Sequence, residues 1–299
     1  MLSLEKNGED KPSVGILMMI LASICFAVMA AMVKYLGHLP LTEIIFFRNL
    51  SIMLIVPLML KNKKISFWGN NKLLLILRSL LSGFIMVAYF YSITAMNLTD
   101  AVTIKQLSPF FIILLASILL REKISFKLVT IFVFAFLGTL LVIKPGFRLN
   151  MYPAIIGLLG AVLTAGSHVA VRRLGSTDHP LVIVNYFGYI IGLVALGILL
   201  WQGNFYIPDI LNLFILNLLG LVGLGGQIAL TKAYQMAPTK LVSLYLYSQI
   251  IFSIFLEILF FQEIPDLLSI SGAFLIIISG YLNYKLNLKL KQKEEIDLL

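Results

Sequence analysis

The sequence predicts an all-α membrane protein of ten transmembrane helices in two inverted five-helix repeats. Three observations support this fold class. Of the 299 residues, 60% are hydrophobic and only 12% are charged, a balance outside the range of water-soluble domains. Long apolar stretches alternate with short polar segments. The second half of the chain also partly repeats the first at an offset of about 140 residues.

Each helix is predicted from the length of an apolar stretch, because about 20 apolar residues are needed to cross the hydrocarbon core. Turn-forming residues such as Pro40, the pair Pro145-Gly146 and Pro208 separate the stretches. The predicted spans, in order, are 13–36, 41–60, 73–95, 98–120, 125–143, 152–172, 181–201, 210–235, 241–262 and 267–286.

The distribution of positive charge predicts the orientation. Lysine and arginine number 23 against 14 acidic residues, and most of them fall in the segments that are cytoplasmic if the N-terminus is inside. The first apolar stretch has no small-residue cleavage pattern, so it is expected to be a retained span. We therefore expect a multi-pass protein of the cell inner (plasma) membrane with both termini cytoplasmic. The excess of positive charge indicates topology and not a nucleic-acid partner.

The internal repeat divides the chain. "AMNLTDAV" (95–102) aligns with "QMAPTKLV" (235–242), and Pro40-Leu41 aligns with Pro180-Leu181. Five spans per repeat is an odd number, so the two copies must be inverted, an arrangement typical of secondary transporters. The predicted parts are an N-terminal tail (1–12), a first repeat (13–145), a second repeat (146–286) and a C-terminal tail (287–299).

Three ionisable residues are predicted to share one layer in the outer half of the membrane. At 1.5 Å per residue, Arg48 and Lys105 lie about 10 Å, and Glu257 about 8 Å, from the outer ends of their helices. A charge inside the membrane is costly and should face a cavity or a partner. The three are therefore predicted to bind substrate. Two alternatives remain open: Lys105 and Glu257 form a structural pair, or Arg48 clamps backbone carbonyls or Glu43.

Lys105 precedes Pro109 by one helical turn. A proline inside a helix leaves the carbonyl four residues earlier without its usual partner. Exposed backbone at membrane depth is tolerated where it lines a cavity or is buried in protein. This spacing predicts that Lys105 lies on a cavity wall, with Ser108 and Pro109 on the same face.

Uncharged polar residues complete the predicted substrate site, since tyrosines stack on ligands and glutamines supply either hydrogen-bond polarity. The residues in this group are Tyr89, Tyr91, Gln106, Gln227, Tyr247 and Gln249. His168 and Arg78 are candidates for a proton relay or gate, the alternatives being a structural histidine and an arginine that reaches the headgroups. The glycines of "GLVGLGG" (220–226), like Gly188 and Gly192, are expected at close helix contacts.

Enzymatic, metal and cofactor chemistry find no support in the sequence. The three histidines have no metal-ligand spacing, and none of the common hydrolase or metalloprotease motifs is present. We expect no enzyme activity, no cofactor and no metal. The expected partners are a small-molecule substrate and membrane lipid, in a monomer or homodimer.

The chain resembles the drug/metabolite transporter superfamily, and within it the EamA-type ten-helix transporters. The resemblance extends from about Gly15 to Tyr284. It rests on "EIIFFRNL" (43–50), "LSPFFIILLASILLREKIS" (107–125), "GTLLVIKP" (138–145), "APTKLVSLYLYSQ" (237–249) and "FFQEIPD" (260–266). The chain departs from the family pattern at Arg121 and Gln262, where glycine is usual, and at Lys105, where an apolar or small residue is usual.

This resemblance implies alternating-access transport of small organic solutes, with a pocket between the two halves. The cationic balance of the predicted site favours a substrate with a carboxylate or phosphate. Glu257 with the tyrosines could equally bind a cation or a zwitterion such as an amino acid. The "FFR" and "LRSLLSG" patterns are similar to the branch that contains bacterial S-adenosylmethionine carriers. The alternative function is a lipid or lipid-carrier flippase of the same fold.

Overall fold

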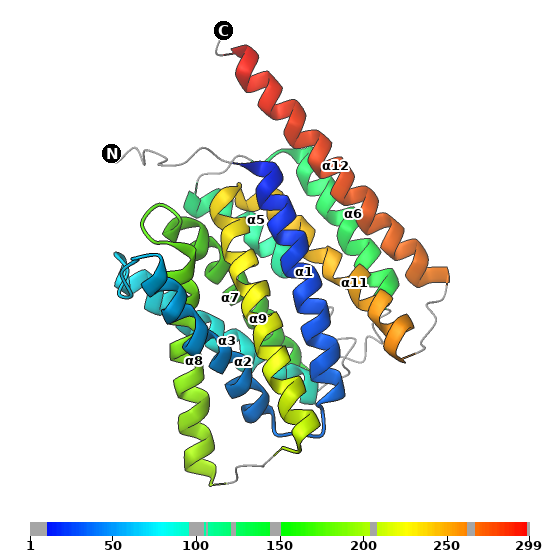
Figure 1. Cartoon of the computed structure of the whole chain (residues 1–299). Coiled ribbons are helices and arrows are strands. Elements are labelled where there is room, and N and C mark those ends of the chain that lie inside the picture. Colours follow the sequence, from blue (N-terminus) through cyan, green and yellow to red (C-terminus); the bar gives the residue numbers. More distant parts are fainter. Residues whose placement is uncertain are drawn as a thin grey trace. The chain divides into compact units, whose positions relative to one another are not determined.

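The protein is an all-α membrane protein, and every element of the described chain is a helix (Figure 1). The computed structural model describes residues 11–95, 105, 107–120, 124–143, 151–203, 208–261 and 267–297. The elements of the first half are α1 (Pro12–Tyr35), α2 (Leu41–Asn62), α3 (Lys72–Ala95), α5 (Ser108–Leu120) and α6 (Phe126–Ile143). Those of the second half are α7 (Met151–Leu174), α8 (Pro180–Gln202), α9 (Ile210–Met236), α10 (Thr239–Val242), η1 (Ser243–Tyr247), α11 (Ser248–Leu256), η2 (Glu257–Phe261) and α12 (Leu267–Asp297).

Helices occupy all ten predicted spans; of the fourth, the structure describes Lys105, which is helical, and the residues from Leu107 onward. Among the described residues, six helices are long and apolar enough to cross a membrane, and three shorter apolar helices accompany them. The ninth span is not one regular helix. It passes from α10 through a 3-10 turn (η1) and α11 to a π-helical turn (η2). The tenth helix continues past the predicted end of its span to Asp297.

Contacts divide the chain into two compact units, each assembled from both halves of the sequence. Unit 1 contains Met1–Gly83 and Ala170–Ala237, and unit 2 contains Phe84–Val169 and Pro238–Leu299. In unit 1, α1 (blue) runs beside α9 (yellow), and α2 packs on α8 and α9 (Figure 1). In unit 2, α6 (green) runs beside α12 (red). In each unit, helices of the first half therefore pack against helices of the second half.

The pairing of helices supports the internal repeat. The second and seventh spans, α2 and α8, pack together, as do the fifth and tenth, α6 and α12. Each of these pairs joins a span to its own counterpart in the other repeat. The first span contacts the eighth (α1 and α9), and the related contact of the third span with the sixth appears where Gly160 of α7 meets Ala88 of α3.

Glycines bring the helices of unit 1 close together, as the sequence predicts. On α8, a Cβ at Gly188 would collide with Ile52 of α2, and one at Gly192 would collide with Met53. On α9, a Cβ at Gly226 would lie 2.9 Å from Cε1 of Phe26 on α1. These glycines therefore lie at close helix contacts, as expected.

Adding one methyl group at Gly188 should destabilise the protein, because Ile52 has a β-branched side chain that cannot turn away easily. We expect Gly188→Ala to lower the free energy of unfolding by about 1–3 kcal/mol. Gly197→Ala is the matched control on the same helix, since nothing lies within 4 Å of a Cβ there. Thermal unfolding in detergent measures both. Equal midpoints for the two variants would show that α2 and α8 are not in close contact.

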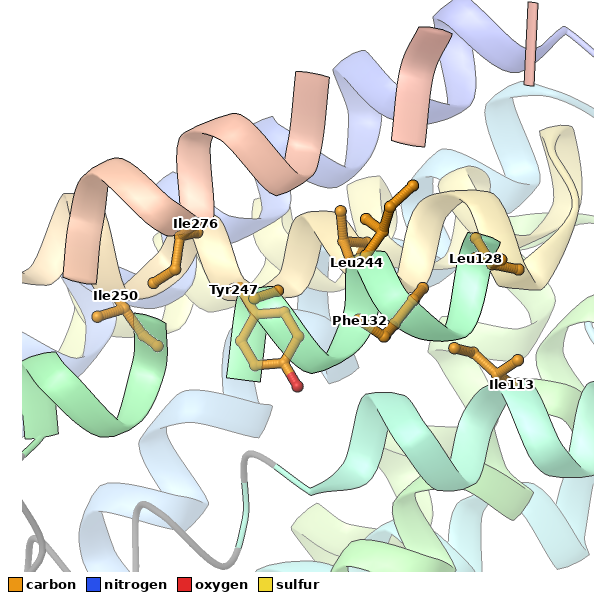
Figure 2. Close-up of a cluster of buried hydrophobic side chains, with 9 residues drawn as sticks. Ile113, Leu128, Phe132, Leu244, Tyr247, Ile250 and Ile276 are labelled. Atoms are coloured by element: carbon orange, nitrogen blue, oxygen red, sulfur yellow. The ribbon is translucent and has the colours of Figure 1, made fainter. Parts of the chain in front are cut away.

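The core of unit 2 is a cluster from five elements (Figure 2). Its buried members are Ile113 of α5, Leu128, Ile131, Phe132 and Ala135 of α6, Leu244 and Tyr247 of η1, Ile250 of α11 and Ile276 of α12. Side chains from α12 also brace the irregular ninth span. Asn283 donates to the carbonyl of Leu241 (3.0 Å), and the Tyr245 hydroxyl donates to the carbonyl of Gly280 (3.0 Å). α12 therefore stabilises the ninth span through side-chain hydrogen bonds where that span is not a regular α-helix.

A polar cluster centred on Asp178 ties together two loops of unit 1. Its carboxylate accepts hydrogen bonds from the backbone N–H of Asn70 (2.6 Å) and Asn71 (3.2 Å) and from the Thr177 hydroxyl (2.7 Å). The carbonyl of Asp178 accepts from Nε2 of Gln235 (3.1 Å). Asp178 is 6% exposed. The side chain of Asp178 thus anchors the segment before α3 and the turn before α8, and its backbone carbonyl anchors the end of α9.

Candidate functional site

Two arginines from different helices meet at one aromatic ring in unit 1. Arg48 lies in the middle of α2, and Arg78 lies about two turns into α3. Phe187 of α8 is in contact with both. The Cζ atom of Arg48 is 5.3 Å from the Phe187 ring centroid, and the Cζ atom of Arg78 is 4.8 Å from it. Both distances are within the range of cation–π attraction.

Helix packing explains why these three residues meet. Gly188 follows Phe187 and allows α8 to approach α2 at Ile52, one turn from Arg48. On the other side, a Cβ at Gly223 of α9 would lie 3.4 Å from Cγ of Arg48. Small residues on two neighbouring helices therefore make room for the arginine stem.

Both guanidinium groups lack the partners that buried charges normally have. Arg78 is 2% exposed, and its Nε and Nη1 atoms form no hydrogen bond. The Nε atom of Arg48 is buried and also forms none. No carboxylate in the part of the chain that the structure describes pairs with either group. The two cations, held at the same ring, also repel each other.

This arrangement suits an oxyanion. Guanidinium is a planar fork of N–H donors that matches a carboxylate or phosphate. A buried donor without an acceptor costs about 1–3 kcal/mol, and more when it is charged. An anion that enters between Arg48 and Arg78 would relieve both the missing hydrogen bonds and the repulsion.

One further predicted residue lies near this pair. Gln227 is buried on α9, one turn after Gly223, the glycine that contacts Arg48. Residues four apart share a helix face, so Gln227 extends the same side of α9. Its predicted role in substrate binding stays a prediction.

The remaining predicted residues belong to unit 2 or lie outside the described part of the chain. Lys105, His168 and Gln249 are half-buried in unit 2. Tyr247 is fully buried in the apolar core of unit 2 (Figure 2), where its ring has a packing role. Gln106 lies outside the described residues, as do the side chains of Tyr89, Tyr91 and Glu257. The proposed layer of Arg48, Lys105 and Glu257 therefore stays a prediction.

Pro109 lies in the first turn of α5, which begins at Ser108. A proline is well tolerated there, because the first N–H groups of a helix have no intrahelical partner. Lys105 is also helical, and residues 96–104 and 106 lie outside the described part of the chain. Ser108 and Pro109 are both buried. That Pro109 frees the Lys105 carbonyl and that these residues line one cavity wall therefore stays a prediction.

Phe187 is the residue that sequence reasoning missed. The chain has 21 phenylalanines, so one more in an apolar helix carries no signal. The available signal was indirect. Gly188 was expected at a close helix contact, and its neighbour in sequence is the ring that both arginines reach.

His179 caps the first turn of α8 at the edge of the membrane-spanning part. Its Nδ1 atom accepts a hydrogen bond from the backbone N–H of Leu181 (3.2 Å). Burial of the ring, and then the charges of Lys63 and Lys232, lower the pKa of His179 below its ordinary value of 6.5. The folded protein thus binds this proton less tightly than the unfolded chain. The stability contributed by neutral His179 is present above pH 6.5 and lost as the pH falls below it.

The thermal midpoint of the wild type should therefore fall when the pH is lowered from about 7.5 to about 5.5. His179→Asn keeps a capping oxygen but does not titrate, so it should lose part of this dependence. Thermal unfolding in detergent across the pH range tests this. If both proteins show the same pH dependence, His179 does not contribute to it.

The EamA-like transporter family model matches residues 13–144 and 151–285. The chain belongs to the EamA-like transporter family. It is therefore a membrane transporter and not an enzyme.

Individual relatives agree with this family. The chain is 35% identical over 269 residues to the pseudopaline exporter CntI of Pseudomonas aeruginosa, covering 89% of this chain and 94% of that one. It is 26% identical over 267 residues to the S-adenosylmethionine uptake transporter of Rickettsia prowazekii, covering 88% and 90%. A solved crystal structure shares the fold with a TM-score of 0.82, at 14% identity, over 94% of this chain and 99% of that one.

Proposed function

We propose that this EamA-family protein is a secondary transporter that moves a small organic metabolite across the cell inner (plasma) membrane by alternating access. The metabolite carries a carboxylate or is a zwitterion of the amino-acid or S-adenosylmethionine type. Both termini are cytoplasmic. The guanidiniums of Arg48, which is half-buried, and Arg78, which is buried, carry this proposal, because both have buried N–H groups without acceptors at one ring.

An unpaired pair of cations inside the membrane indicates a functional role, because its cost is high. A charge inside a spanning helix costs about 2.5–3.5 kcal/mol on insertion scales, and two unpaired ones at the same ring add repulsion to that. A structural role would be better served by an acidic partner or by apolar side chains. Substrate binding gives the two arginines a partner that is present only part of the time.

The relatives support transport of a soluble metabolite. One of them is named as an exporter of pseudopaline and another as an uptake transporter of S-adenosylmethionine. Their names indicate opposite directions, so the family alone does not give the direction here. Lys105 and Glu257 remain proposed substrate contacts in unit 2.

Reconstitution into liposomes tests the proposal. Vesicles preloaded with a mixture of amino acids, organic acids or S-adenosylmethionine should exchange at least one labelled compound, and Arg48→Gln should reduce that exchange by at least about tenfold. A lipid flippase, the alternative function, would instead move fluorescent lipid analogues between leaflets. Lipid movement without exchange of any soluble compound would overturn the proposal.

A further inference from the structure

We infer that the substrate presents two negative charges to unit 1, one for Arg48 and one for Arg78. The substrate would then be an organic dianion, either a dicarboxylate or a phosphate monoester. This inference rests on the proposed transport function, excludes the zwitterionic substrates and adds phosphate monoesters to the carboxylates. The chemistry common to both alternatives is a pair of anionic oxygen groups close enough to reach two guanidiniums that share the Phe187 ring.

The charge count is the first argument. Unit 1 has three described acidic residues, Glu43, Asp178 and Asp209. Asp178 accepts hydrogen bonds from the loop before α3, and Asp209 caps α9 at Asn212. Glu43 is buried on α2 and forms no ion pair with Arg48 or Arg78 in the described part of the chain. A monocarboxylate would therefore leave one buried guanidinium uncompensated.

The donor count is the second argument. Three N–H-bearing atoms are buried without acceptors, Nε of Arg48 and Nε and Nη1 of Arg78. They belong to two separate forks, and each fork matches one carboxylate edge. A single carboxylate has one edge of two oxygens, so it can pair side by side with one fork and reaches the other only through its remaining lone pairs. Two carboxylates, or one phosphate with three terminal oxygens, can offer an edge to each fork.

The third argument concerns net charge. A zwitterion brings an ammonium group together with its single carboxylate. Placed at this pair, it would leave the local charge as positive as before. Two like charges repel strongly where water is excluded. A dianion makes the site neutral, and this favours its entry over that of a monoanion or zwitterion.

Matched probes test the inference on the full-length protein in detergent. Succinate and glutarate are compared with succinamate and glutaramate, which have the same shape and one carboxylate fewer. Methyl phosphate is compared with dimethyl phosphate at pH 8, where the monoester is doubly charged. The readout is the rise in thermal midpoint with probe concentration at constant ionic strength.

We expect at least one dianion to stabilise the protein at concentrations about tenfold or more below those of its monoanionic match. If only the dicarboxylates bind more tightly than their monoanionic matches, the substrate is a dicarboxylate. If only methyl phosphate binds more tightly than dimethyl phosphate, the substrate is a phosphate monoester. Arg78→Gln should bind the dianion and its match with similar affinity, because one charge has been removed. An arginine that acts only in packing would lower the midpoint without changing this discrimination.

The failures of the two proposals are distinguishable. Equal stabilisation by a dianion and its match would overturn the inference and leave the proposed transporter of monoanions or zwitterions intact. Stabilisation by none of the anions, with unchanged exchange in Arg48→Gln vesicles, would overturn both.

Discussion

Arg78→Met should abolish transport and leave the empty protein at least as stable as the wild type. Arg78 is 2% exposed and has no acidic partner among the described residues. Methionine fills much of the same volume, and replacing a buried ionic group by an apolar one is often neutral or stabilising. The lost contact with Phe187 is worth only about 0.5–2 kcal/mol. The net change in unfolding free energy should therefore lie between zero and a gain of about 2 kcal/mol.

Transport should respond in the opposite direction. Removing one member of a buried charge pair typically weakens binding by about 2–5 kcal/mol, a loss of at least about 30-fold in affinity. Exchange in liposomes and thermal unfolding in detergent measure the two effects on the same preparation. Arg173→Met is the control, because Arg173 is exposed in the last turn of α7. If Arg78→Met unfolds more easily than Arg173→Met and still transports, Arg78 is a structural residue.

The helices were predictable because each depends on a local property. Apolar length decides where a helix crosses the membrane, and prolines such as Pro40 and Pro180 decide where the next one begins. The irregular course of residues 239–261 was not predictable in the same way. It depends on contacts with α12, such as the hydrogen bond from Asn283 to Leu241, which no local pattern encodes.

The candidate site was predictable only in part. Arg48 was predicted as a substrate residue because a charge in an apolar helix is unusual. Depths counted at 1.5 Å per residue place Arg48 in the outer half of the membrane. The same count places Arg78 nearer the cytoplasmic side, so the sequence does not predict that the two arginines meet. Both nevertheless reach Phe187, and a meeting of side chains from three helices cannot be obtained from spacing along one helix. The grouping of Arg48 with Lys105 and Glu257 rests on that same count and stays a prediction.

Asp178→Ala should destabilise the protein more than the loss of an ordinary helix cap. The carboxylate is nearly buried and accepts three hydrogen bonds, from Asn70, Asn71 and Thr177. Removing it leaves these donors without an acceptor, at a combined cost of about 3 kcal/mol. Asp209→Ala is the matched control. Its carboxylate accepts a single hydrogen bond, from the N–H of Asn212 at 2.9 Å, and its loss should cost only about 1 kcal/mol.

The loss of the Asp178 side chain should also weaken anion binding at the candidate site. Asn71 precedes the first residue of α3 and caps it through Leu74, and Arg78 follows on the same helix. Without Asp178 the start of α3 is less firmly held, so the Arg78 guanidinium should be less well placed for an anion. We expect the anionic probe to stabilise Asp178→Ala less than it stabilises the wild type, at temperatures where the variant is still folded. The probe should stabilise Asp209→Ala as much as the wild type. Equal responses in the two variants would show that the loop cluster contributes stability alone and that α3 positions Arg78 through its packing.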